Sequence, residues 1–96
     1  MKLSNAIKTL ERAGFVVTHD APRESMMNPG TINPPSFYWG QRPGAEHLIE
    51  ILRNGCNSDS VATIRVRRVT DRDDLQSDYF AGSFVPTLKR AIQWAT

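Results

Sequence analysis

A chain of 96 residues, with 40% hydrophobic and 23% charged residues, has material for one hydrophobic core but not for two, which predicts a single domain over residues 1–96. Twelve Lys and Arg against ten Asp and Glu leave a formal net charge of +2, a near balance that does not demand a nucleic-acid partner. Cys56 is the only cysteine, so no intrachain disulfide can form, and without a signal-peptide core or a membrane-length apolar run we expect a cytoplasmic protein.

The chain begins with the pattern of an amphipathic helix, because its apolar residues recur every three or four positions. Ser4 is the expected N-cap, and Gly14 is the expected residue of positive φ that ends the helix. The apolar stripe consists of Leu3, Ala6, Ile7, Leu10 and Ala13. Aromatic and β-branched residues follow at once over 15–18 and predict a first strand.

Residues 19–36 carry five Pro and Gly residues with little periodicity, which predicts a long loop without regular structure. Met26 and Met27 in this loop have two interpretations. They form an adaptable contact surface, or the loop folds back over the edge of the core, and we favour the second. Residues 37–40 predict a short strand whose aromatic side chains pack within the protein, with a stacking platform for nucleic-acid bases as the alternative.

The segment 45–53 is ambiguous, because its apolar residues fit both a helical stripe and a strand that enters a hairpin at Asn54-Gly55. We favour the strand, since the clear strand over 61–67 needs a partner close by in the sequence. A last apolar stripe predicts a closing helix with Pro86 in its first turn: Phe84, Leu88, Ala91, Ile92 and Ala95. The predicted fold is therefore α+β, an antiparallel sheet of about four strands flanked by an N-terminal and a C-terminal helix.

Catalytic motifs are missing from the sequence, which contains no Gly-rich phosphate loop, nucleophile elbow or HExxH helix. His19, His47 and Cys56 stand apart from one another and from any patterned partner. We therefore predict a protein that is not an enzyme and needs no cofactor. An enzymatic interpretation survives only if His47, Cys56 and the aspartates assemble a site in the fold.

The most concentrated charge lies in the strand over 61–67 and the connection after it. Alternation places Arg65 and Arg67 on one face of the strand, away from Ile64 and Val66, and we expect that face to be exposed to solvent. It is either an ordinary polar face neutralised by nearby aspartates, which we favour, or a contact surface for phosphate or an acidic protein. The aspartates offer oxygen ligands for Ca²⁺, but their spacing does not match an EF-hand loop, so we favour the absence of a metal site and keep Ca²⁺ binding as the alternative.

Three segments resemble the small domains associated with large polyvalent proteins of phages and conjugative elements. They are Leu3 to Ile7 continuing through Ala13-Gly14-Phe15, then Ile64 to Arg68, and then Asp78 to Gly82 leading into Leu88 and Ala91-Ile92. The resemblance implies a strand before Asn54-Gly55, a mobile-element setting and a module that contacts a host protein or nucleic acid. It implies no catalytic residues and no mechanism.

Our first functional hypothesis is a non-catalytic interaction module of a phage or mobile element that binds a host protein, for example to inhibit a host defence system. The alternative is a nucleic-acid-binding module that uses the arginine-bearing strand. The predicted partner-binding residues are Arg65, Arg67, Arg68, Asp71, Arg72, Asp73, Asp74, Asp78 and Tyr79. The sequence does not predict an oligomeric state.

Overall fold

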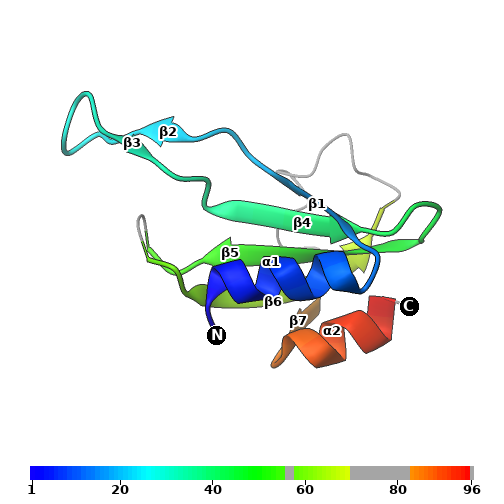
Figure 1. Cartoon of the computed structure of the whole chain (residues 1–96). Coiled ribbons are helices and arrows are strands. Elements are labelled where there is room, and N and C mark those ends of the chain that lie inside the picture. The colour runs from blue at the N-terminus through cyan, green and yellow to red at the C-terminus, as the bar shows by residue number, and fades with distance from the viewer. Residues whose placement is uncertain (56–57, 70–82, 96) are drawn as a thin grey trace.

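A computed structural model describes residues 1–55, 58–69 and 83–95 as two helices and an antiparallel sheet (Figure 1). The main sheet has five strands in the order β1-β4-β5-β6-β7. In chain order, the two helices and the five strands of this sheet are α1 (Leu3–Arg12), β1 (Val16–His19), β4 (Phe37–Gln41), β5 (His47–Arg53), β6 (Val61–Arg68), β7 (Ser83–Val85) and α2 (Leu88–Ala95). The α+β class is thus confirmed, with one strand more in the main sheet than the four expected. None of the described helices has the length and apolar character needed to span a membrane.

The segment that fitted both helix and strand is strand β5, as the hairpin argument predicted. It lies in the middle of the sheet, paired with β4 on one side and β6 on the other. Ile49 and Ile51 point to one face and Leu48 to the other, and all three are buried. A strand buried on both faces reads as a nearly continuous apolar run, which is why its sequence imitates a helical stripe.

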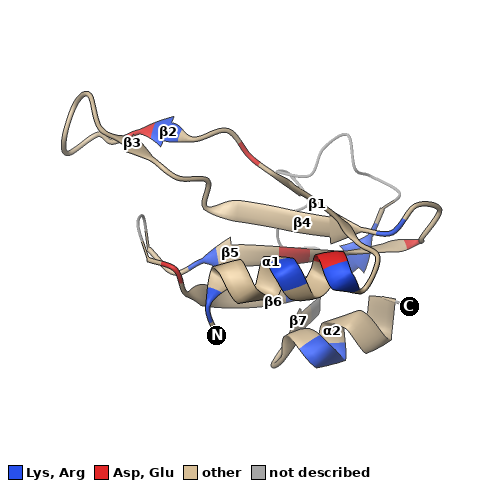
Figure 2. Cartoon of the chain, in the orientation of Figure 1, with Lys and Arg blue, Asp and Glu red and all other residues tan. Residues whose placement is uncertain are grey.

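Both described helices pack on the same face of the sheet, where they build the hydrophobic core. This core joins apolar residues of α1 and α2 to the strands: Leu3, Ala6, Leu10, Leu88, Ala91, Ala95, Ile49, Ile51, Ile64 and Val66. Helix α1 approaches β4 closely at Gly40, where an added Cβ would lie 3.2 Å from a methyl group of Leu10. The charged residues of α1 lie on its exposed side (Figure 2).

The start of α1 differs from the prediction, because Lys2 and not Ser4 occupies the N-cap position. Ser4 is already helical, and both its backbone N–H and its hydroxyl donate hydrogen bonds to the carboxylate of Asp59, at 2.9 and 2.8 Å. Ser4 thus ties the helix to the segment before β6. The predicted end of the helix is confirmed, with Gly14 at φ +90°.

The closing helix is shorter than predicted, because residues 83–85 form strand β7 and α2 begins only at Leu88. The ring of Pro86 disfavours helical φ and ψ in the residue before it, so Val85 stays extended. Phe84 therefore belongs to no helical stripe. Its side chain lies on the sheet face opposite the helices and is 61% exposed.

Residues 19–36 contain more regular structure than the predicted loop. Strands β2 (Arg23–Glu24) and β3 (Ile32–Asn33) pair with each other in a separate two-stranded antiparallel sheet. This hairpin projects past the end of β4, away from the helices (Figure 1). The prediction of a long irregular loop was therefore wrong for β2, β3 and His19, which ends β1, while the residues between these strands carry no helix or strand.

Candidate partner-binding face

The second face of the main sheet, opposite both described helices, carries the residues of functional interest. In an antiparallel sheet, residues directly opposite each other on neighbouring strands point to the same face. The register thus forms one continuous row across all five strands: Thr18, Trp39, Glu50, Arg65 and Phe84. Neighbouring rows add Leu48 opposite Arg67, and Leu52 between Phe37 and Thr63. Apart from Thr18 of β1, these are nine residues of β4 to β7, and we call the nine the second face.

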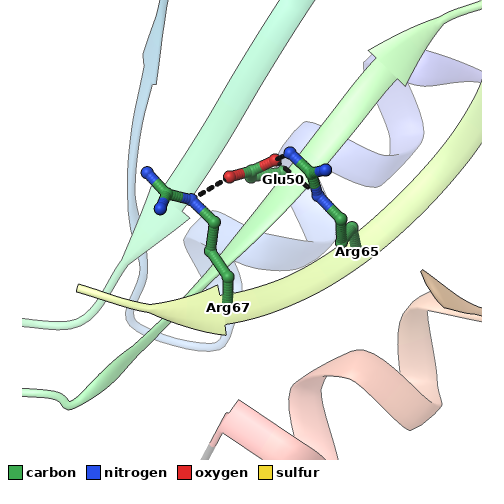
Figure 3. A network of polar contacts seen from close by, with 3 residues as sticks. All are labelled: Glu50, Arg65 and Arg67. Atoms are coloured by element: carbon green, nitrogen blue, oxygen red, sulfur yellow. Dashed lines mark hydrogen bonds and ion pairs between the residues drawn. The ribbon is translucent and has the colours of Figure 1, made fainter. Parts of the chain in front are cut away.

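Glu50 bridges two arginines at the centre of this face (Figure 3). The Nε of Arg65 donates to Oε2 of Glu50 at 2.8 Å, and the terminal Nη2 of Arg65 contacts the same oxygen. Arg67 pairs through its Nε with the other carboxylate oxygen, Oε1. One carboxylate is therefore shared by two guanidinium groups from alternate positions of β6.

The prediction that Arg65 and Arg67 are exposed was wrong. Their exposed fractions are 3% and 6%, and that of Glu50 is 3%. Alternation identified the face on which the two arginines lie, but it carries no information about how much of that face is covered. The sequence predicts that aspartates later in the chain neutralise the two arginines. In the structure, Glu50 of the neighbouring strand β5 neutralises them instead.

Burial raises the pKa of the Glu50 carboxyl above its ordinary value, and the hydrogen bonds and charges of Arg65 and Arg67 offset only part of that rise. The direction follows from the cost of taking a carboxylate out of water. A buried ion pair stabilises a fold only when its geometry and hydrogen bonds compensate for that cost. Glu50, Arg65 and Arg67, here called the triad, therefore form a structural element whose members depend on one another.

Aromatic side chains surround the triad and are more accessible than its charges. The guanidinium carbon of Arg65 lies 5.8 Å from the centre of the Phe84 ring, within cation–π range. The rings of Phe37 and Trp39 contact each other with centroids 5.5 Å apart. A small pocket with room for about one water molecule is lined by Phe37, Glu50, Leu52, Thr63, Arg65 and Phe84.

The remaining predicted partner-binding residues divide into two groups. Arg68 is exposed at the end of β6, opposite His47. The residues of the acidic connection lie outside the described part of the chain, and their role stays a prediction: Asp71, Arg72, Asp73, Asp74, Asp78 and Tyr79. Among the described residues, no group of three or more His, Cys, Asp or Glu side chains is placed to hold a metal ion.

Glu50 and Phe84 are the two members of this face whose roles the sequence analysis missed. A charged residue inside the apolar run 48–52 was the available signal for Glu50, because a carboxylate in a buried strand requires a partner. For Phe84 the signal was Pro86 two residues later, which favours extended backbone before it.

Comparisons of the chain with protein-family models, curated proteins and solved structures found no match. The class that the fold defines is an α+β domain with a helix-covered face and a charged, aromatic second face. The resemblance to domains of large polyvalent proteins stays a prediction.

Proposed function

We propose that this chain is a non-catalytic interaction module of a phage or other mobile element, and that it binds a host protein such as a component of a defence system. The contact surface in this proposal is the aromatic edge of the second face around Phe84. The predicted contacts after β6, from Asp71 to Tyr79, lie outside the described residues and stay a prediction.

The observation that carries the proposal is an exposed aromatic ring supported by a buried ionic cluster. Phe84 leaves 61% of its surface exposed, although large apolar side chains of this kind are usually covered. The guanidinium of Arg65 lies against the ring and is itself fixed by Glu50. Aromatic residues on a rigid support lose little conformational entropy on binding and are frequent anchors of protein interfaces.

The alternative, a nucleic-acid-binding module, uses Arg65 and Arg67 as phosphate contacts. Both guanidinium groups are buried and paired with Glu50, so a phosphate would have to displace a carboxylate that is already in place. Arg68 alone remains as an exposed arginine on this part of β6. These contacts favour a protein partner over nucleic acid.

Affinity purification of the tagged full-length chain from its native host, with mass spectrometry, tests the proposal. Phe84→Ser and Val16→Ser form a matched pair, because the two side chains are 61% and 63% exposed on opposite edge strands of the sheet. We expect a specific host protein with the wild type and with Val16→Ser, and its loss with Phe84→Ser. No host protein enriched above the background would refute the proposal.

A salt titration of the purified complex separates the two functions. Phosphate contacts release counterions, so nucleic-acid binding weakens steeply as salt rises, with a slope of about one unit per contact. A contact centred on Phe84 should weaken much less. A steep slope together with loss of the complex on nuclease treatment would favour the nucleic-acid alternative.

A further inference from the structure

The hairpin formed by residues 23–33, here called the arm, stands apart from the body of the protein (Figure 1). Among the residues that the structure describes, its two strands pair only with each other, in the register Arg23 to Asn33 and Glu24 to Ile32. It contributes no residue to the hydrophobic core described above. The arm therefore needs an explanation other than the stability of the core.

Four hydrogen bonds lie within the turn at the tip of the arm. The backbone N–H of Ser25 donates to the carbonyl of Thr31 at 2.8 Å, and that of Thr31 donates to the carbonyl of Asn28 at 3.0 Å. The hydroxyl of Ser25 accepts from the N–H of Asn28 at 3.2 Å, and the carboxylate of Glu24 accepts from the N–H of Gly30 at 2.9 Å. Gly30 has φ +92°, a conformation that other residues rarely adopt. Polar side chains thus shape the turn.

The turn presents apolar side chains to solvent. Met26 is 97% exposed and Met27 is 88% exposed, and Ile32 beside them is also exposed. The expected fold-back of this loop over the core edge is therefore wrong. Methionine is normally among the buried residue types, so the projecting tip carries two neighbouring apolar side chains that the described residues leave uncovered.

We propose that the arm inserts its Met26-Met27 tip into an apolar cleft of the protein partner. This inference rests on the proposed function in treating the chain as an interaction module, but it places an anchor on a different surface. Methionine side chains are unbranched and polarisable, so they adapt to the shape of a cleft. A convex tip of this kind fits a concave partner surface.

The lack of charged residues at the tip argues for a protein partner rather than a nucleic acid or an anionic membrane. Residues 25–32 contain no Lys, Arg, Asp or Glu, and the loop between β2 and β3 carries neither blue nor red in Figure 2. Nucleic acids and anionic lipid surfaces are bound through clustered Lys and Arg. The tip also lacks the Trp and Tyr that are typical of membrane interfaces.

Site-specific photo-crosslinking in the native host tests the arm. We would place p-benzoylphenylalanine at Met26, at Met27 and, as a control, at Lys8, which is exposed on α1. We expect one host protein to be crosslinked from both arm positions and not from Lys8. Equal crosslinking from Lys8, or products that contain only nucleic acid, lipid or a second copy of this chain, would overturn the inference.

Binding of the crosslinked protein, once purified, gives the quantitative test. The double variant Met26→Ser/Met27→Ser should raise the Kd by about tenfold or more, since it removes two apolar side chains from the buried contact. The control Lys8→Ser/Arg12→Ser changes two exposed residues of α1 and should leave the Kd unchanged. An unchanged Kd for the methionine variant, with loss of the same partner by Phe84→Ser, would refute the arm and leave the proposed function intact.

Discussion

Replacing Glu50 by Leu is the most direct test of the reasoning about the second face. The substitution keeps a side chain of similar length in the centre of β5 but removes the carboxylate that Arg65 and Arg67 share. Two buried guanidinium groups then lie close together without the negative charge between them. The protein either relocates their charges to solvent, which disrupts the face, or tolerates them where they are.

The expected cost follows from measurements on buried ion pairs, in which removing one partner destabilises a protein by about 3–5 kcal/mol. A domain of this size has a free energy of unfolding of about 5–15 kcal/mol, so the loss is a large fraction of the total. The melting temperature should fall by about 12–40 °C, at about 4–8 °C per kcal/mol. Glu50→Gln should cost less than Glu50→Leu, because the amide keeps an oxygen that can accept a hydrogen bond from the buried guanidinium of Arg65.

Urea denaturation followed by circular dichroism measures these differences, with Glu46→Leu as the matched control. Glu46 precedes β5 and is exposed, so the same chemical change there should alter the free energy of unfolding by no more than about 0.5 kcal/mol. If Glu50→Leu were as stable as Glu46→Leu, the triad would not contribute to folding, and its description as an interdependent structural element would be refuted.

Three further substitutions test the fold. Leu10→Asp places a charge at a fully buried position of α1 and should destabilise the protein by about 4 kcal/mol or more. An unchanged melting temperature would show that α1 is not part of the core. Gly40→Val should lower the free energy of unfolding by about 1–3 kcal/mol, because the added Cβ would lie 3.2 Å from a methyl group of Leu10 and 3.4 Å from Cβ of Phe15. An unshifted urea midpoint would contradict this close approach. Hydrogen bonds from Ser4 hold the pKa of Asp59 below its ordinary value of 3.8, so this contact stabilises the fold fully above that pH and progressively less as the pH falls through the lowered pKa. Ser4→Ala removes the hydroxyl and should reduce the acid-dependent loss of stability, as measured by melting temperatures below pH 4, and an identical pH profile would exclude a contribution of the hydroxyl hydrogen bond.

Local sequence patterns predicted most of the fold. The spacing of Leu3, Ala6 and Leu10 identified α1 and its buried stripe, and Gly14 identified its end. The strand over 61–67 needs a neighbour close by in the sequence, and this argument correctly predicted a strand in the ambiguous segment 45–53. These predictions succeeded because helix and strand periodicity depend on neighbours only a few residues apart.

The predictions that failed depend on what covers a residue, which periodicity does not report. Alternation placed Arg65 and Arg67 on the correct face but left their burial and their pairing with Glu50 undetermined, because the pairing depends on the register of β5 against β6. Phe84 matched a helical spacing relative to Leu88, yet the backbone restriction imposed by Pro86 outweighed that match. Contact sites are harder to predict than folds for the same reason.

Glu50 connects the stability of the sheet to the proposed contact surface. Its carboxylate lies in a strand buried on both faces, so it requires charged partners on a neighbouring strand, and the register supplies Arg65 directly opposite. The next residue in the same row is Phe84, against whose ring the guanidinium of Arg65 lies. The hydrogen bonds between Arg65 and the buried carboxylate of Glu50 therefore also fix the guanidinium beside the exposed Phe84 ring. The orientation of this aromatic edge thus depends on the central strands β5 and β6 and not on the edge strand β7 alone.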